Sequence, residues 1–166
     1  MKDLNKLASE CEQDLLSIGI QPGKVNRWII NTRAKCRWGL CKTVQPGLFD
    51  ISIAARLLQD DIDDQAAKNT ILHELLHTVK GCKGHKGQWK ELAAKVNRRL
   101  PQYTIKRTTS EEEKGFERTV RVRTNRYTVK CSKCGREYHR EKESKVIQHP
   151  EKYRCGACNS PLVRVK

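Results

Sequence analysis

The chain has 166 residues, which is enough for one domain and a small module and excludes two large domains. Hydrophobic residues make up 37% of the chain and aromatic residues only 5%, which predicts a small hydrophobic core. Part of the chain is therefore expected to need stabilisation beyond apolar burial. A formal charge of +15 favours a polyanionic partner such as nucleic acid.

No apolar run approaches the roughly 20 residues that a membrane span requires, and the N-terminus lacks the apolar core of a signal peptide. We therefore expect a soluble, cytoplasmic protein without membrane contact. In that reducing compartment, the eight cysteines are expected to be metal ligands and free buried thiols instead of four disulfides.

Hydrophobic periodicity predicts a mixed α+β domain over residues 1–107. A Gln-Pro-Gly turn joins the last two predicted strands, and four aspartates near residue 60 favour the start of a helix. In chain order, the predicted elements are a helix over residues 2–18, strands over 25–32, 37–43 and 48–53 that form a small sheet, and helices over 65–80 and 87–100.

The remaining third of the chain is predicted to be a linker and a second, smaller module. Residues 108–118 are polar and without a period, which is typical of a linker. Loose alternation of apolar and basic residues resumes at Thr119 and predicts a strand or hairpin that leads into Cys131. We expect residues 119–166 to form this module.

The segment His73–His77 reads His-Glu-Leu-Leu-His and matches the H-E-x-x-H pattern of zinc metalloproteases. On an α-helix, a four-residue step puts both imidazoles on one face, where they can share a cation. Zinc with three protein ligands keeps a fourth position for water and lowers the pKa of that water towards about 7. Glu74 is the predicted general base beside this water. The alternative is that the two histidines only pack against the core.

His85 is the predicted third zinc ligand, because it is the only other histidine before residue 139. Three glycines around it let the chain turn back towards the helix, although an exposed loop histidine is the alternative. Cys82 lies in the same loop, and one hypothesis is that its thiolate reaches the metal as a redox-sensitive brake. The simpler interpretation is that Cys82 is a free thiol, as are Cys11, Cys36 and Cys41.

With these motifs the sequence resembles the SprT-like (Spartan-related) family of zinc-dependent proteases. The resemblance rests on residues 31–33 and 38–41, the strand 49–53, the helix segment 70–77, and His85 with the aromatic Trp89 four residues later. It implies a zincin-like, gluzincin-like α+β domain with a three-stranded sheet and an active-site helix, and it implies hydrolysis of peptide bonds. In characterised relatives, cleavage is coupled to DNA and directed at proteins crosslinked to it.

Two Cys-x-x-Cys pairs, Cys131 with Cys134 and Cys155 with Cys158, are separated by 20 residues, the arrangement of a four-cysteine zinc ribbon. A disulfide or redox role is the alternative. Four thiolates leave no open position on zinc, so the zinc at the cysteines is predicted to be structural. The zinc at the histidines is predicted to be catalytic. Many SprT-like proteins end in such a ribbon.

Basic residues with interleaved tyrosines surround the ribbon cysteines and predict nucleic-acid binding, through phosphate contacts and base stacking. An ordinary solvated surface with tyrosines in a small core is the alternative. Single-stranded DNA is the preferred partner by family analogy only. The predicted contact residues are Arg121, Arg123, Arg126, Tyr127, Lys133, Arg136, Tyr138 and Arg140.

The sequence therefore predicts a zinc metalloprotease that acts on DNA-associated or DNA-crosslinked proteins. Two other functions stay open. The first is a nucleic-acid-binding adaptor with weak or no proteolytic activity. The second is a zinc hydrolase of small amides or peptides, for which the basic surface is incidental.

Overall fold

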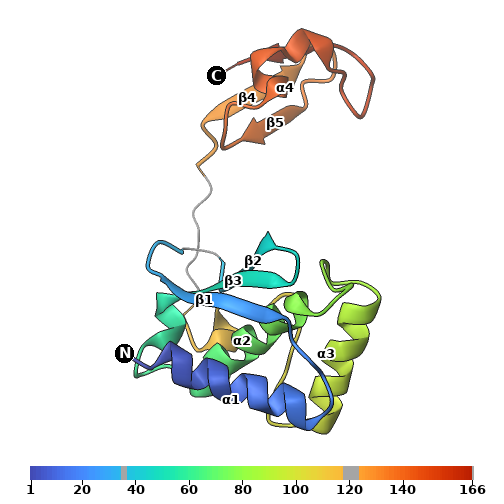
Figure 1. Cartoon of the computed structure of the whole chain (residues 1–166). Coiled ribbons are helices and arrows are strands. Elements are labelled where there is room, and N and C mark those ends of the chain that lie inside the picture. The colour runs from blue at the N-terminus through green and yellow to red at the C-terminus, as the bar shows by residue number, and fades with distance from the viewer. Residues whose placement is uncertain (35–36, 118–123, 166) are drawn as a thin grey trace. The chain divides into compact units, whose positions relative to one another are not determined.

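A computed structural model describes residues 1–34, 37–117 and 124–165 of the chain. The chain divides into two compact units, Met1–Arg118 and Thr119–Lys166 (Figure 1). Both units contain helices and a small sheet, which confirms the prediction of a mixed α+β chain.

The elements of the first unit follow the predicted order closely. Two 3-10 helices, which the sequence patterns did not predict, follow the third strand and the last α-helix. The elements are α1 (Leu4–Ser17), β1 (Lys24–Asn31), β2 (Gly39–Gln45), β3 (Leu48–Ala54), η1 (Ala55–Leu58), α2 (Asp64–Thr78), α3 (Gln88–Arg99) and η2 (Glu112–Lys114).

The sheet of the first unit has the strand order β1-β3-β2, with β3 parallel to β1 and antiparallel to β2. Ile51 and Ile53 of β3 are fully buried, and α1 and α2 lie on that side of the sheet (Figure 1). Alternation along β3 explains this burial, because successive side chains of a strand point to opposite faces. Among the described residues, one edge of β2 has no partner strand.

Helix α2 runs through the middle of this core and contacts β2, β3, α1 and α3. Asp63 caps its N-terminus, since the Asp63 carboxylate accepts a hydrogen bond from the backbone N–H of Gln65 at 2.9 Å. Leu72, Leu75 and Leu76 are completely buried. Their spacing at three- and four-residue steps anchors the helix, and the His73–His77 segment is held in a fixed orientation.

Residues 111–116 pack on the first unit, whereas the sequence predicted a linker over residues 108–118. The Lys114 ammonium is 4% exposed and donates hydrogen bonds to the Ala66 carbonyl at 2.8 Å and the Thr70 hydroxyl at 2.7 Å. The Phe116 ring stacks on Trp38 with a centroid distance of 5.2 Å. These contacts join residues more than 40 positions apart and leave no local sequence pattern. The polar composition of the segment therefore suggested a free connector.

The second unit has a three-stranded antiparallel sheet with the order β5-β4-β6 and a short helix beside it. Val129, Ile147 and Leu162 form its small core together with two of the ribbon cysteines. The predicted strand from Thr119 begins at Tyr127, and residues 118–123 lie outside the described part of the chain. The elements are β4 (Tyr127–Cys131), β5 (Glu137–Arg140), α4 (Lys145–Gln148), η3 (Pro150–Lys152) and β6 (Leu162–Arg164).

Helices of the described segments are too short or too polar to cross a lipid bilayer.

We expect Lys114 to make the stability of the first unit depend on pH. Burial lowers the pKa of Lys114 from 10.5 to about 8, so the folded chain loses this proton at a lower pH than the unfolded chain does. The contribution of Lys114 to stability is therefore lowest below pH 8 and rises between pH 8 and 10.5, by about 3 kcal/mol in the limit. Urea titrations of wild type and Lys114→Met at several pH values, followed by tryptophan fluorescence, measure this difference.

All three tryptophans, Trp28, Trp38 and Trp89, lie in the first unit, so their fluorescence reports on that unit. The difference in unfolding free energy between wild type and Lys114→Met should grow in favour of wild type as the pH rises. Parallel pH curves for the two proteins would show that Lys114 carries its usual pKa.

Candidate metal centres

Three imidazoles converge in the first unit, as the sequence predicted. His73 and His77 project from the same face of α2, and His85 returns from the loop before α3. The His85 Nε2 atom lies 2.8 Å from Nε2 of His73 and 3.1 Å from Nε2 of His77. Three imidazoles that share a tetrahedral zinc place their nitrogens about 3.3 Å apart, because Zn–N bonds are about 2.0–2.1 Å long. The spacing therefore suits one zinc ion.

The outer nitrogens of two of these rings are fixed by backbone carbonyls. His73 Nδ1 donates to the Lys106 carbonyl at 2.9 Å, and His77 Nδ1 donates to the Cys82 carbonyl at 2.8 Å. A neutral imidazole that donates from Nδ1 has a lone pair on Nε2, which is the form that binds a metal. If His85 Nε2 carries a hydrogen, it cannot donate well to the Nε2 lone pairs of both His73 and His77. A single cation can bind all three Nε2 atoms.

Burial also favours the neutral, metal-binding form of His73 and His85. The pKa of His73 falls to about 4, mainly because the ring is buried and further because His77 and His85 lie beside it. Burial lowers the pKa of His85 as well, followed by the effects of His77 and Arg107. His73 and His85 therefore need no deprotonation at neutral pH before a cation binds.

Trp89 packs against all three imidazoles and is the main contact residue that pattern analysis did not assign to the site. Its ring centroid lies 4.8 Å from His73, 5.5 Å from His77 and 4.7 Å from His85. Trp89 is almost fully buried in the first turn of α3. Its position four residues after His85 was the available signal, but hydrophobic periodicity alone placed it in the core.

The Glu74 side chain is buried between α2 and β2, with 7% of its surface exposed, and it lines the same cavity as the histidines. Burial raises the pKa of Glu74 to about 7, against the opposing effects of a hydrogen bond from the Cys41 backbone and the charge of Arg37. A divalent cation at the histidines would lower this pKa again. The carboxyl group is therefore held in place and can gain or lose a proton.

Gly39 on β2 makes room for this carboxyl group. A Cβ atom at position 39 would lie 2.5 Å from Glu74 Oε1 and 2.7 Å from Glu74 Cγ. Any other residue there would displace the carboxylate, so the glycine is a positional requirement of the site. The sequence motif contained this glycine, but spacing alone did not show which side chain it faces.

Cys82 takes part in the site through its backbone and not through its thiol. The Cys82 side chain is completely buried in the core, where burial raises the pKa of the thiol. Only the three histidines form the metal-binding group of the described part of the first unit. The hypothesis of a thiolate brake on the metal therefore has no support in this geometry.

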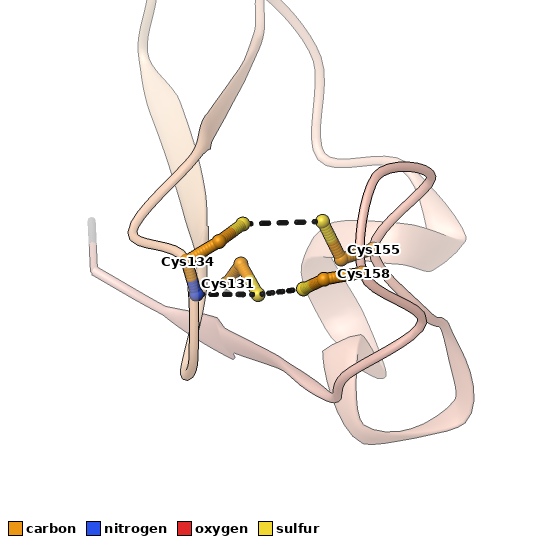
Figure 2. A group of neighbouring side chains, drawn as sticks. All are labelled: Cys131, Cys134, Cys155 and Cys158. Carbon is orange, nitrogen blue, oxygen red and sulfur yellow. Dashed lines mark hydrogen bonds between the residues drawn. The ribbon is translucent and has the colours of Figure 1, made fainter.

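The four ribbon cysteines also converge, from two loops that face each other (Figure 2). The Sγ atoms of Cys131 and Cys158 are 3.4 Å apart, and those of Cys134 and Cys155 are 3.6 Å apart. Sulfurs that share a tetrahedral zinc lie about 3.8 Å apart, because Zn–S bonds are about 2.3 Å long. Backbone N–H groups point at two of the sulfurs, which stabilises thiolates. The cluster suits a closed structural zinc site.

Tyr138 supports this cluster. Its hydroxyl donates to the Cys155 sulfur at 3.2 Å and accepts from the Gly156 N–H at 3.2 Å. The hydrogen bond from Tyr138 is the largest of several effects that lower the pKa of Cys155 to about 6. Tyr138 was predicted to stack on nucleic-acid bases, but its ring packs on the ribbon core and its hydroxyl contacts a metal ligand.

The other predicted nucleic-acid residues divide into two groups. Tyr127 is partly buried against the ribbon core, and the Arg164 guanidinium lies 5.7 Å from its ring centroid. Arg126, Lys133, Arg136 and Arg140 are exposed. Arg121 and Arg123 lie outside the described residues. Four of the predicted cations are therefore exposed, whereas the two predicted tyrosines pack within the module.

We expect wild-type protein to bind two zinc ions per chain and His73→Ala to bind one. The variant removes one of three imidazoles, while the ribbon keeps all four thiols. Elemental analysis after removal of excess zinc measures the ratio, and Cys131→Ser is the matched variant for the other site. A wild-type value of one, unchanged in His73→Ala, would exclude a zinc ion at the histidines.

Tyr138→Phe should weaken zinc binding at the ribbon by about tenfold, because loss of an outer-shell hydrogen bond commonly costs 10–100-fold in metal affinity. A chromophoric zinc chelator can follow release from the ribbon. Tyr153→Phe is the matched control, since Tyr153 also packs on this core and the described contacts place no hydrogen bond on its hydroxyl. Equal release from both variants would contradict a role for the Tyr138 hydroxyl.

The sequence of this chain was compared with those of known protein families and proteins. The SprT-like family model matches residues 6–111, which contain all three histidines and Glu74. "Protein SprT-like" of Lactiplantibacillus plantarum is 28% identical over 118 residues, which is 68% of this chain and 68% of that protein. The family match covers well over half of the chain, and the chain belongs to the SprT-like family.

Proposed function

We propose that this protein is a zinc-dependent peptidase with a zincin-like first unit, and that it acts on DNA-associated or DNA-crosslinked proteins. The observation that supports it best is the placement of three imidazoles and one buried carboxyl group on the wall of one cavity of about 1310 Å³. A purely structural zinc site would need neither the cavity nor the carboxyl group.

His73, His77 and His85 would hold the metal in this proposal. Bound zinc supplies Lewis acidity, which polarises a peptide carbonyl and makes water more acidic. The carbonyls of Lys106 and Cys82 keep two of the rings oriented, and Trp89 excludes water from the side of the rings that faces α3.

Glu74 would act as the general base. Its carboxylate takes a proton from the attacking water and then delivers it to the amine that leaves when the peptide bond breaks. The backbone N–H of Cys41 and the contact with Gly39 hold the carboxylate against β2, so it needs little reorganisation before this transfer.

The free edge of β2 gives an extended polypeptide a place to bind. Gly39, Leu40, Cys41 and Thr43 of this strand line the cavity, and β3 pairs with the opposite edge. Unpaired backbone groups on an edge strand can pair with an added strand irrespective of its side chains. This arrangement favours a protein or peptide as substrate over a small amide.

The ribbon supports the nucleic-acid part of the proposal. Its zinc would be structural, and its exposed cations Lys133 and Arg136 lie beside the first Cys-x-x-Cys pair, where they are free to contact phosphates. Because such contacts read charge and not sequence, we propose DNA, with single-stranded DNA included, as a partner without strong sequence preference.

Replacement of Glu74 by Gln should abolish proteolysis, with at least a hundredfold loss of rate, and leave two zinc ions bound per chain. The ligands remain, but the amide cannot accept a proton. The substrates are an unfolded protein and the same protein crosslinked to single-stranded DNA. Proteolysis that persists in Glu74→Gln would refute the assignment of the base, and DNA binding without any wild-type proteolysis would favour an adaptor.

Gly39→Ala provides a second variant that leaves every ligand and the base chemically intact. The added methyl group would displace the Glu74 carboxyl group, so proteolysis should fall at least tenfold with the zinc content unchanged. Gly84→Ala is the matched control, because a Cβ atom at position 84 would meet no atom within 4 Å. Equal activity of both variants would show that the Gly39 contact does not position the base.

A further inference from the structure

The cavity of the candidate zinc site is lined by many more positive than negative side chains. Glu74 is its one carboxyl group among the residues that the structure describes. Zinc at the histidines would add further positive charge. The six Lys and Arg residues of the lining are Arg37, Lys80, Lys83, Lys106, Arg107 and Lys114.

Two of these six cations are already engaged within the protein. Lys106 forms an ion pair with Glu113, and Lys114 is buried against α2. The other four, Arg37, Lys80, Lys83 and Arg107, are exposed, and within residues 1–34, 37–117 and 124–165 none of them forms an ion pair with a carboxylate. These four residues, termed here the cleft cations, are available to a bound molecule.

The cleft cations come from both ends of the cavity. Lys80 and Lys83 lie in the loop that follows the C-terminus of α2, between His77 and His85. Arg107 lies near His73, because the carbonyl of the preceding residue, Lys106, accepts a hydrogen bond from His73. His73 is one helical turn nearer the N-terminus of α2 than His77 is. Arg37 lies just before β2, where Gly39 contacts Glu74. Positive charge therefore flanks the zinc site on both sides.

We propose, building on the peptidase function proposed above, that this cavity selects acidic polypeptide segments, with Asp or Glu on both sides of the bond to be cleaved. A polypeptide suits the site better than a nucleic acid for two reasons. Part of the cavity wall is the edge strand β2, and an edge strand can pair with an extended polypeptide. The Trp and Phe rings of the lining already pack within the protein, since Trp38 stacks on Phe116 and Phe49 lies against Gly23.

Binding to the zinc-loaded Glu74→Gln protein tests the proposal without turnover. Three labelled peptides of equal length, with acidic, uncharged or basic residues on both sides of a common centre, are compared by fluorescence anisotropy. The acidic peptide should bind at least tenfold more tightly than the basic peptide at 50 mM salt. This ratio should shrink at 500 mM salt, because exposed charges are screened.

The double variant Lys80→Glu/Lys83→Glu, made in the same background, should abolish the preference, with the acidic peptide losing about tenfold in affinity. Both lysines are exposed, so the change disturbs no packing. Lys90→Glu/Arg98→Glu is the matched control, since it changes the net charge equally at exposed positions of α3 that do not line the cavity. The control variant should keep the preference.

Equal affinity for the acidic and basic peptides, or loss of the preference in the control variant, would overturn the proposal. Binding of single-stranded DNA that depends on Lys80 and Lys83, without peptide binding, would overturn it in favour of a nucleic-acid site. A wild-type protein that cleaves nothing, with the acidic preference intact, would refute the peptidase function alone. Cleavage of acidic and basic substrates at equal rates would refute the selectivity alone.

Discussion

The first unit depends on one constraint, namely that a helix at the centre of the core must also present polar side chains to a cavity. Leu72, Leu75 and Leu76 bury one side of α2 completely, while His73 and His77 remain partly exposed on another. A buried polar group is costly unless it is hydrogen-bonded or bound to a metal. The surrounding structure satisfies this requirement with backbone carbonyls, a packed tryptophan and a glycine.

These supporting contacts explain why short connecting segments lie where they do. The segment after α3 is held along α2 by the Lys106 carbonyl and by the Lys114 ammonium, which contact positions 33 and 48 residues earlier in the chain. Phe116 then stacks on Trp38 at the edge of the cavity. The cavity wall is therefore built largely from irregular segments, which the helix and sheet hold in place.

The ribbon solves a similar problem with a much smaller core. Val129, Ile147 and Leu162 bury little apolar surface, and the cysteines Cys131 and Cys155 pack among them. Metal binding would then supply much of the folding free energy of this unit, as in other small zinc modules. Tyr127 and Tyr138, which the sequence predicted to stack on bases, pack against this core, since the unit has few other large side chains.

The sequence by itself determined the helices and strands of the first unit and the candidate metal ligands. Hydrophobic periodicity and the spacings of His73, His77 and the four cysteines express local geometry, which a helix or a tight turn fixes within a few residues. The tertiary structure decided what surrounds these ligands. Trp89 contacts His77 across 12 residues, Gly39 faces Glu74 across 35, and Lys114 contacts Ala66 across 48. No local period records such contacts, because they form only when the core packs.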